Sequence, residues 1–268
     1  MTAVWLREVE DAVLRRIAAA ESVFCFLDYD GTLSVLAPTP DAATPLAGTA
    51  ERLQALAVLP GTQVALVSGR TIADMRRYLD VPGIYYVGVH GLQIQFPNGV
   101  TQLSERAAVM RSVLPAVKRE IERALAGRPG VLIEDKEIAL ACHYRLASCA
   151  DAAIARQTVA TVARSYQGHG VLVTHGHEVV EIRPAFANKG TAVCQLLAAH
   201  GRSALAVYIG DDQTDEDAFT LLPEGSITIR VGLASAPTVA RYRVPEPDDV
   251  LRFLGAMTDS RCSNRLCG

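Results

Sequence analysis

One stretch, VFCFLDYDGTL at residues 23–33, constrains the fold more than any other part of the chain. Its first five residues are mostly apolar, which is typical of a strand buried in a parallel sheet. Asp28 and Asp30 follow this strand directly, and like charges so close oppose each other's ionisation unless a cation lies between them. Carboxylate oxygens of this kind suit Mg²⁺. The alternative is an ordinary turn after a strand, because Asp and Gly are common turn residues.

The bulk composition indicates a folded chain with a sizeable core. Half of its residues are hydrophobic and 21% are charged, which allows such a core. Its length of 268 residues is enough for one large domain or two smaller ones. The net charge of −3 argues against a nucleic-acid-binding protein, which is usually basic. No apolar run approaches the roughly 20 residues that span a bilayer, and the first 20 residues lack the apolar centre of a signal peptide.

The six cysteines are scattered, without a CxxC pair. In a chain of this size they are typical of reduced thiols, although Cys262 and Cys267 in the polar tail could pair with each other. We therefore expect a soluble cytoplasmic protein that binds neither a membrane nor nucleic acid.

Strands and helices are predicted to alternate over the first hundred residues. Expected are an amphipathic helix over 4–20, the strand over 23–27, an irregular proline-rich loop, a helix over 45–57, a strand over 62–67, a helix over 72–79 and a strand over 84–89. This order is typical of a parallel sheet with right-handed crossovers. The proline-rich loop would lie over the carboxyl end of the first strand, where open α/β sheets bind ligands.

The pattern changes after residue 90, at a short hairpin that turns at residues 97–99. Expected next are a helix over 104–126, strands over 131–135 and 137–145, a helix over 149–166, and strands over 171–174 and 178–183. We interpret 101–184 as an inserted α+β domain between two parts of an α/β core, 1–100 and 185–268. The second part would contain a helix over 189–199, strands over 204–209 and 226–231, a helix over 248–257 and a loose polar tail.

Further polar groups are predicted to gather at the same edge of the core sheet. Ser68 follows the second strand, Lys189 opens a helix, and Asp211, Asp212 and Asp215 follow the strand over 204–209. Each alone has an ordinary explanation. A lysine can be a solvated helix residue, a serine a helix cap, and acids are favourable at a helix N-terminus. Their joint occurrence favours a functional site.

These segments together resemble a known superfamily. DYDGTL, VSGR at 67–70, Lys189 and GDDQTDEDAF at 210–219 are similar to the four motifs of the haloacid dehalogenase-like phosphatases. The stretches APTPDAATP, VGVHG, IEDKEIALACHYR and VVEIRP narrow the resemblance to the trehalose-phosphatase family, over nearly the whole chain. The resemblance implies a haloacid dehalogenase-like doubly wound core with an inserted α+β cap domain.

The resemblance also implies an activity, the Mg²⁺-dependent hydrolysis of trehalose 6-phosphate to trehalose and phosphate through an aspartyl phosphate. In that scheme Asp28 is the nucleophile, Asp30 the general acid and base, and Ser68 and Lys189 hold the phosphate. The metal ligands would be Asp28, Asp211 and the backbone carbonyl of Asp30. Asp215, and more weakly Asp212, would support the metal, while Gly31 and Thr32 would shape the phosphate-binding loop. A functional pairing with a trehalose-6-phosphate synthase is also implied.

Within the inserted domain, the resemblance assigns Glu134, Lys136 and Glu181 to the distal glucose, with Arg70 and Arg145 as weaker candidates. Strand alternation places Glu134 and Lys136 on one face and Glu181 on the polar face of its own strand. Without the resemblance, these residues would be the solvent face of an antiparallel sheet.

Two positions depart from the family pattern: Val89, where the family usually has Asn or Ser, and Gln93, where it has an acid. They affect the expected substrate preference rather than the reaction. The alternatives are another sugar phosphate as substrate, sucrose 6-phosphate or a glycosyl-phosphoglycerate, and a catalytically silent domain that binds a sugar phosphate or regulates a synthase. His169, His175 and His177 are expected to face solvent, because no carboxylate or cysteine lies at metal-ligand spacing.

Overall fold

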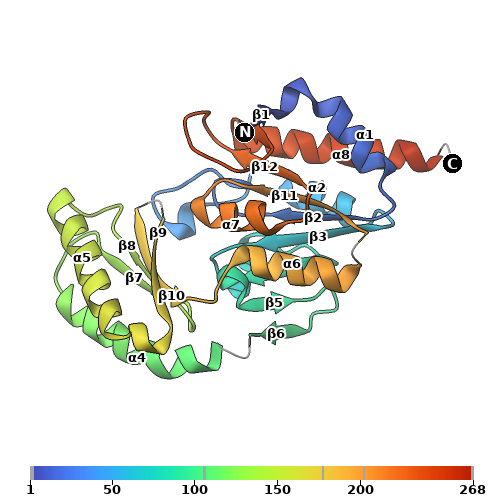
Figure 1. Ribbon diagram of the computed structural model, residues 1–268. Helices are drawn as coiled ribbons and strands as arrows, with labels where there is room; N and C mark the ends of the chain where they lie inside the picture. Colours follow the sequence, from blue (N-terminus) through green and yellow to red (C-terminus); the bar gives the residue numbers. More distant parts are fainter. Residues whose placement is uncertain (1–2, 105–106, 177, 202, 267–268) are drawn as a thin grey trace. The chain divides into compact units, whose positions relative to one another are not determined.

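The computed structural model describes residues 3–104, 107–176, 178–201 and 203–266 (Figure 1). Its contacts divide the chain into two compact units. The core unit comprises Met1–Ala37, Ala43–Gln102 and Asn188–Gly268, and the inserted unit comprises Pro38–Ala42 and Leu103–Ala187. The inserted unit thus includes a short piece of the proline-rich loop, where Pro40–Ala42 form a single 3₁₀ turn, η2.

A nine-stranded sheet forms the centre of the core unit, in the order β1-β13-β12-β11-β2-β3-β4-β5-β6. From β1 to β4 the neighbouring strands are parallel, and β5 is antiparallel to β4. The strands are β1 (Val4–Trp5), β2 (Val23–Leu27), β3 (Thr62–Val67), β4 (Tyr85–Gly88), β5 (Gln93–Gln95), β6 (Thr101–Leu103), β11 (Leu205–Gly210), β12 (Ile227–Val231) and β13 (Tyr242–Val244).

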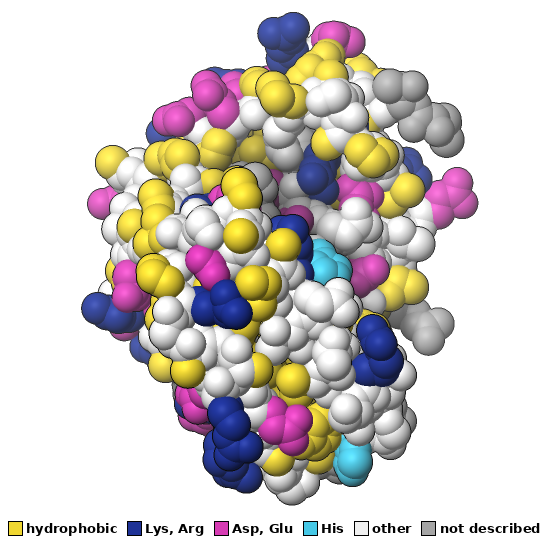
Figure 2. All heavy atoms as spheres, turned by 90° about the vertical axis from the view of Figure 1, so that its left-hand side faces the viewer, with side chains coloured by type: hydrophobic (Ala, Val, Ile, Leu, Met, Phe, Trp, Pro, Cys, Tyr) yellow, Lys and Arg dark blue, Asp and Glu magenta, His cyan; other side chains and the backbone are white. Residues whose placement is uncertain are grey.

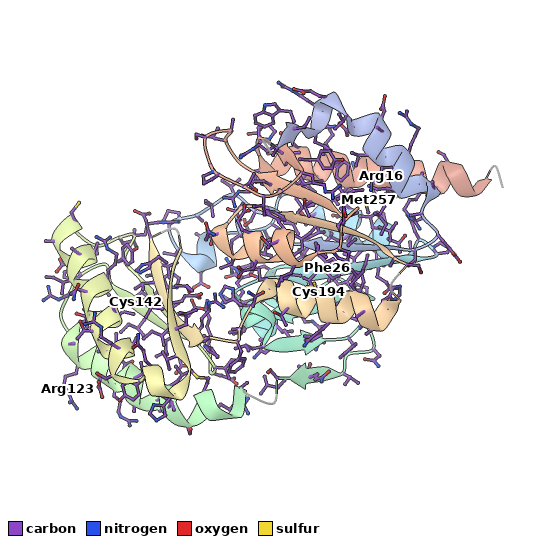
Figure 3. The ribbon with its side chains drawn as sticks, in the orientation of Figure 1. Arg16, Phe26, Arg123, Cys142, Cys194 and Met257 are labelled. Atoms are coloured by element: carbon purple, nitrogen blue, oxygen red, sulfur yellow. The ribbon has the colours of Figure 1, made fainter. Side chains whose placement is uncertain are left out.

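Alternation along β2 supplies both layers of the core. Cys25 and Leu27 pack in one apolar cluster, while Phe24 and Phe26 pack in another on the opposite face. Figure 3 labels Phe26 on the side of α6 and Met257 on the side of α8. This confirms the predicted doubly wound α/β core. The covering helices are α1 (Glu10–Ala19), α2 (Thr49–Ala57), α3 (Ile72–Tyr78) and α8 (Pro247–Leu266) on the first face, and α6 (Lys189–His200) and α7 (Gln213–Leu221) on the second.

The two ends of the chain differ from expectation. The helix predicted over 4–20 begins only at Glu10, because Val4 and Trp5 pair as a parallel strand with Tyr242 and Arg243 of β13, a strand that was not predicted. The tail predicted to be loose is helical to Leu266. Arg261 explains this. It is 2% exposed and donates to the carbonyls of Ile17 and Ala20 and to the Thr62 hydroxyl.

The inserted unit is a four-stranded antiparallel sheet, in the order β7-β8-β10-β9, with two helices packed on one face. Leu140, Cys142, Val180 and Ile182 point from the central strands into this apolar layer. The strand predicted over 137–145 is shorter, because Glu137 has a φ of +65° and lies in a turn before β8. The elements are α4 (Ala107–Ala124), β7 (Leu132–Asp135), β8 (Leu140–His143), α5 (Cys149–Ser165), β9 (Val171–Gly176) and β10 (Val179–Pro184).

The surface is mixed in character. On the face drawn in Figure 2, basic and acidic side chains are interspersed with hydrophobic ones. Among the described residues, none of the helices has the length and the apolar composition needed to cross a bilayer. Cys262 is a free thiol, and Cys267 lies outside the described residues.

Candidate active site

The carboxyl ends of three neighbouring strands bring predicted site residues of the core unit together. Asp28 follows β2, Ser68 follows β3, and Asp211 follows β11. Because β2 is parallel to both neighbours, the three residues lie at one edge of the sheet. The chain proceeds from β2 outward through β3 and from β11 outward through β12, so the boundary between β2 and β11 is a topological switch point. Open α/β sheets bind their ligands at such points.

Three carboxylates form a cluster at this boundary. One oxygen each of Asp28, Asp211 and Asp215 lies within 4.8 Å of the other two. Lys189, the first residue of α6, donates from Nζ to Asp28 Oδ1 at 2.7 Å and to Asp215 Oδ1 at 2.9 Å. The lysine side chain is only 3% exposed, so water screens its charge little. A single buried ammonium therefore bridges two of the three acids.

Asp215 is the most firmly held member of the cluster. Its Oδ2 accepts from the backbone N–H groups of Asp211 and Asp212, in a capping box at the start of α7. Its Oδ1 accepts from the Tyr208 hydroxyl at 2.7 Å as well as from Lys189. These bonds fix the orientation of Asp215. Sequence reasoning missed Tyr208, because it lies within the apolar strand LAVYIG, where its hydroxyl is the one polar signal.

Two glycines permit the close packing around the acids. A Cβ on Gly31 would lie 2.0 Å from Asp211 Oδ2, and Gly31 also has a φ of +75° that side chains rarely adopt. A Cβ on Gly210 would lie 2.3 Å from Asp215 Cγ. Gly31 of the DYDGTL motif is thus required because the side chain of Asp211, 180 positions later in the sequence, occupies the space that a Cβ would need.

Burial and mutual repulsion oppose ionisation of the acids. Burial first, and then the charge of Asp215, raise the pKa of Asp28 to about 7, although Lys189 lowers it. Burial and the charge of Asp28 raise the pKa of Asp211 well above its ordinary value. Burial works to lower the pKa of Lys189, but the two carboxylates outweigh it and raise that pKa, so the ammonium stays charged. The cluster therefore carries an excess of acidic groups over cations.

The donor set fits a hard divalent cation. Asp211 Oδ1 is buried and accepts no hydrogen bond from any described residue, which ordinarily costs about 1–3 kcal/mol. A cation between Asp28 and Asp211 would give this oxygen a partner and would favour the ionised form of both acids. Carboxylate oxygens without nitrogen or sulfur are the ligands of Mg²⁺ or Ca²⁺.

Asp30 forms a two-point ion pair with Arg70. Arg70 donates from Nε to Asp30 Oδ2 at 2.8 Å and from Nη2 to Asp30 Oδ1 at 2.7 Å. Its Nη1 donates to Asp74 at 2.9 Å, and its guanidinium lies 4.7 Å from the centre of the Tyr29 ring. Arg70 was predicted as a weaker candidate for binding sugar. The structure places it against Asp30, the predicted acid–base residue, and its role in binding sugar stays a prediction.

Ser68 and Gln93 complete this edge of the core unit. Ser68 Oγ accepts from the Arg70 backbone N–H at 3.1 Å, so its own hydroxyl hydrogen can be donated to an anion. Gln93 Oε1 accepts from the Ile72 N–H at 3.2 Å, at the start of α3. The amide oxygen of Gln93 accepts this bond as a carboxylate oxygen would. Gln93 therefore provides a hydrogen-bond acceptor at a position where the family usually has an acid.

The three residues predicted to bind the distal glucose lie in the inserted unit, and each is paired with a neighbouring side chain. Glu134 and Glu181 lie level with Ala141 in the strand register, on opposite sides of β8. Lys136 forms a hydrogen-bonded ion pair with Glu181, and His143 Nε2 lies 2.8 Å from Glu134 Oε2. Burial would raise the pKa of Glu134, but the His143 bond and the charge of Lys136 lower it.

His143 was missed by sequence reasoning. Its signal was the period of two in LACHYR, which puts it on the same face as Ala141. Arg145, predicted as a weaker candidate, forms an ion pair with Glu178 at 2.8 Å.

The histidines considered as metal ligands form no such site in the described part of the chain. His175 is exposed on β9, and His169 lies beside the ring of Tyr166, with 6.1 Å between ring centres. His177 lies outside the described residues. Among the residues described, Asp28, Asp211 and Asp215 are the one set of three or more metal-ligating groups whose donor atoms come together.

The fold and the placement of the acids at the switch point define a class of protein. A solved haloacid dehalogenase-like hydrolase from Bacteroides thetaiotaomicron superposes with a TM-score of 0.63 at 16% identity, covering 87% of this chain and 98% of the other. The fold is therefore haloacid dehalogenase-like.

The sequence model of the trehalose-phosphatases matches residues 26–248, and this chain belongs to that family. The C-terminal domain of a Candida albicans trehalose-6-phosphate phosphatase superposes with a TM-score of 0.85 at 26% identity, covering 97% of this chain and 98% of that domain. A trehalose-phosphate phosphatase of Mycobacterium marinum is 36% identical in an alignment of 244 residues that covers 87% of this chain and 60% of the relative. The chain thus spans about three fifths of the length of the curated relatives it matches.

Proposed function

We propose that this protein hydrolyses trehalose 6-phosphate to trehalose and phosphate. The observation that carries the proposal is the buried arrangement of Asp28, Lys189 and Asp215 beside Asp211, at the switch point of a haloacid dehalogenase-like sheet. The relatives named as trehalose-phosphate phosphatases indicate the substrate.

In the first half-reaction, an oxygen of Asp28 attacks phosphorus in line with the bond to the sugar oxygen. The new bond joins Asp28 to phosphorus, and the bond from phosphorus to the sugar oxygen breaks. Asp30 gives its proton to the departing sugar oxygen, while Arg70 keeps a hydrogen bond to the other oxygen of Asp30. Lys189 and Ser68 donate to the phosphoryl oxygens and offset their negative charge.

In the second half-reaction, water attacks the phosphorus of the aspartyl phosphate. Asp30, now ionised, takes a proton from that water, and the bond between phosphorus and Asp28 breaks. Phosphate leaves, and Asp28 and Asp30 return to their starting states. Asp30 therefore has to keep its position in both steps, and Arg70, which donates to its carboxylate oxygens, would provide this.

Magnesium is the proposed metal, held by Asp28, Asp211 and the backbone carbonyl of Asp30. When bound, it would screen the negative charge of the phosphate from the attacking carboxylate. Asp215 would keep Asp211 and Lys189 in place, since it accepts hydrogen bonds from both residues. Asp212 would serve the helix as its N-cap rather than the metal.

Recognition of the sugar is proposed to belong to the inserted unit, residues 101–184 by our prediction, acting as a cap. Glu134, Lys136 and Glu181 present carboxylates and an ammonium that can bind sugar hydroxyls. The pairing of Lys136 with Glu181 supports this, because it holds an ammonium and a carboxylate in a fixed orientation on one face of the sheet. We further propose a cytoplasmic protein that takes its substrate from a trehalose-6-phosphate synthase.

The test is phosphate release by the purified full chain from trehalose 6-phosphate, sucrose 6-phosphate and a glucosyl-phosphoglycerate, each with Mg²⁺ and with EDTA. We expect kcat/KM for trehalose 6-phosphate to exceed the others by at least about tenfold, the effect of one or two sugar hydrogen bonds, and to require the metal. A higher value for sucrose 6-phosphate would change the substrate. No release from any of them by a folded protein would indicate a silent domain.

A further inference from the structure

The turn Val89–Gly91, η3, follows β4 at the carboxyl edge of the core sheet and has an unusual backbone. Val89 and His90 have φ values of +47° and +53°, in the left-handed region. Such values are uncommon for residues other than glycine and are especially unfavourable for a β-branched valine. A strained conformation persists only where its surroundings enforce it, and strain of this kind is concentrated at functional sites.

On one side the turn is bonded to the end of β3. The His90 N–H donates to the Ser68 carbonyl at 3.0 Å, and the Val89 N–H donates to the Arg70 carbonyl at 2.8 Å. The His90 ring covers Gly69, where an added Cβ would lie 2.8 Å from both Cε1 and Nε2. His90 is 5% exposed. The backbone that presents Ser68 is thus held by two hydrogen bonds and by the buried ring that lies against Gly69.

On its other side the turn contacts the start of α6. A Cβ on Gly91 would lie 2.7 Å from Ala192 Cβ and 3.1 Å from the Asn188 carbonyl oxygen. Asn188 is the N-cap of this helix, and its side chain accepts from the Thr191 N–H. Lys189 is the next residue. The same turn therefore touches both segments that carry the proposed phosphate-binding side chains.

We propose that η3 is the spacer that sets the distance between Ser68 and Lys189, and that His90 is the positioning residue on which this spacing depends. The proposal rests on the proposed function, in which these two residues hold the phosphate. The ring of His90 prevents the turn at Gly69 from moving inward, while Gly91 brings α6 close. His90 acts through Ser68 and Gly69 and takes no part in bond breaking.

Binding of inorganic phosphate in the presence of Mg²⁺ tests the spacing without involving the sugar. Calorimetric titration would compare the wild type with His90→Ala and His90→Phe. Loss of the ring should weaken phosphate binding by roughly 5- to 50-fold, the effect of misplacing a positioned ligand, whereas the phenyl ring should preserve most of the affinity. Equal weakening in both variants would mean that the imidazole nitrogens act directly, and would overturn the positioning role. Unchanged affinity in His90→Ala would overturn the spacer.

A double-mutant cycle tests the contact itself. Gly69→Ala should push the His90 ring away and weaken phosphate binding, and adding His90→Ala should recover part of that loss because space becomes available. The absence of recovery in the double variant would contradict the proposal. Gly168→Ala, where an added Cβ meets nothing within 4 Å, is the matched control and should bind phosphate as the wild type does.

The cycle and the proposed function can fail separately. Hydrolysis of trehalose 6-phosphate by the wild type decides the substrate, whereas the phosphate affinities decide the spacer. If Gly69→Ala does not fold, the comparison of His90→Ala with His90→Phe still determines whether the ring of His90 sets the spacing.

Discussion

Arg70 donates one hydrogen bond to each carboxylate oxygen of Asp30, from two nitrogens of the same guanidinium. This parallel geometry fixes the plane of the carboxylate as well as its position. Arg70 itself is held by Asp74 and by the ring of Tyr29. The residue that would move protons in both half-reactions is therefore oriented by a neighbour 40 positions away in the sequence.

Replacing Arg70 with Lys should lower kcat by about 10- to 100-fold, because an ammonium cannot make the two parallel bonds that orient Asp30. Steady-state kinetics with trehalose 6-phosphate would measure it. Arg76→Lys is the matched control, since Arg76 forms an exposed pair with Asp80 and should affect kcat little. An Arg70→Lys enzyme with a wild-type kcat would show that Asp30 needs no such orientation.

Asp28→Asn should reduce turnover by several orders of magnitude while leaving the fold intact, because an amide cannot act as the nucleophile. The metal-free variant should unfold at a temperature equal to or above that of the metal-free wild type. The reason is that one buried acid, which raises the pKa of Asp211, is removed. Differential scanning fluorimetry and a phosphate-release assay would measure the two effects. Activity above about a hundredth of the wild-type value would point to a different nucleophile.

The raised pKa of Asp28 predicts how pH affects the metal-free protein. Between its ordinary value of 3.8 and the folded value of about 7, the folded state binds more protons than the unfolded state. The free energy of unfolding should therefore fall as pH rises through this range. The raised pKa of Asp211 acts in the same direction.

Mg²⁺ should oppose this loss, because it binds the ionised carboxylates of the folded state. We expect the Tm in EDTA to be lower at pH 8 than at pH 5.5, and Mg²⁺ to raise the Tm more at pH 8. A Tm increase by Mg²⁺ that is the same at both pH values would contradict a metal site on these acids.

Lys136→Ala should separate sugar recognition from chemistry. We expect kcat/KM for trehalose 6-phosphate to fall by roughly 10- to 1,000-fold, because charged hydrogen bonds to the sugar are lost and Glu181 loses its ion pair with Lys136. Hydrolysis of p-nitrophenyl phosphate, which has no second sugar, should change little. Lys118→Ala is the control, since Lys118 pairs with Asp135 on the exposed surface. Equal losses on both substrates would assign Lys136 a structural role.

Arg261→Met should destabilise the protein by about 2–4 kcal/mol, because the buried carbonyl of Ile17 and the half-buried carbonyl of Ala20 would lose this donor. Arg252, which pairs with Glu10 on the surface, offers a matched control whose replacement with Met should cost less than about 1 kcal/mol. Chemical denaturation would compare them. A loss for Arg261→Met as small as that expected for the control would mean that the last turns of α8 add little to stability.

The sequence allowed prediction of those strands that carry a local signal. Val23–Leu27 and Thr62–Val67 lie in the structure where their apolar runs place them. β1 and β13 were missed because they are two and three residues long, and pairing with a distant strand decides their conformation. The last turns of α8 were missed because their burial depends on Arg261, whose charge indicates exposure in a pattern analysis.

At the candidate site, the motif positions predicted which residues gather, because the ends of parallel strands share an edge. Hydrogen-bond partners were beyond prediction. Nothing local couples Arg70 to Asp30, His143 to Glu134 or Tyr208 to Asp215, since each pairing depends on how separate elements pack. The resemblance implied Arg70 as a weaker candidate for binding sugar, which stays a prediction, and its hydrogen bonds to Asp30 were not predicted.

The position of β2 between β3 and β11 also determines when the site can form during synthesis. β3 follows β2 closely, but β11 begins at Leu205, after the whole inserted unit has been made. Until then one edge of VFCFL has no partner strand, and such an apolar edge pairs readily with other chains. A nascent or truncated chain that ends before Leu205 is therefore the form of this protein most prone to aggregate.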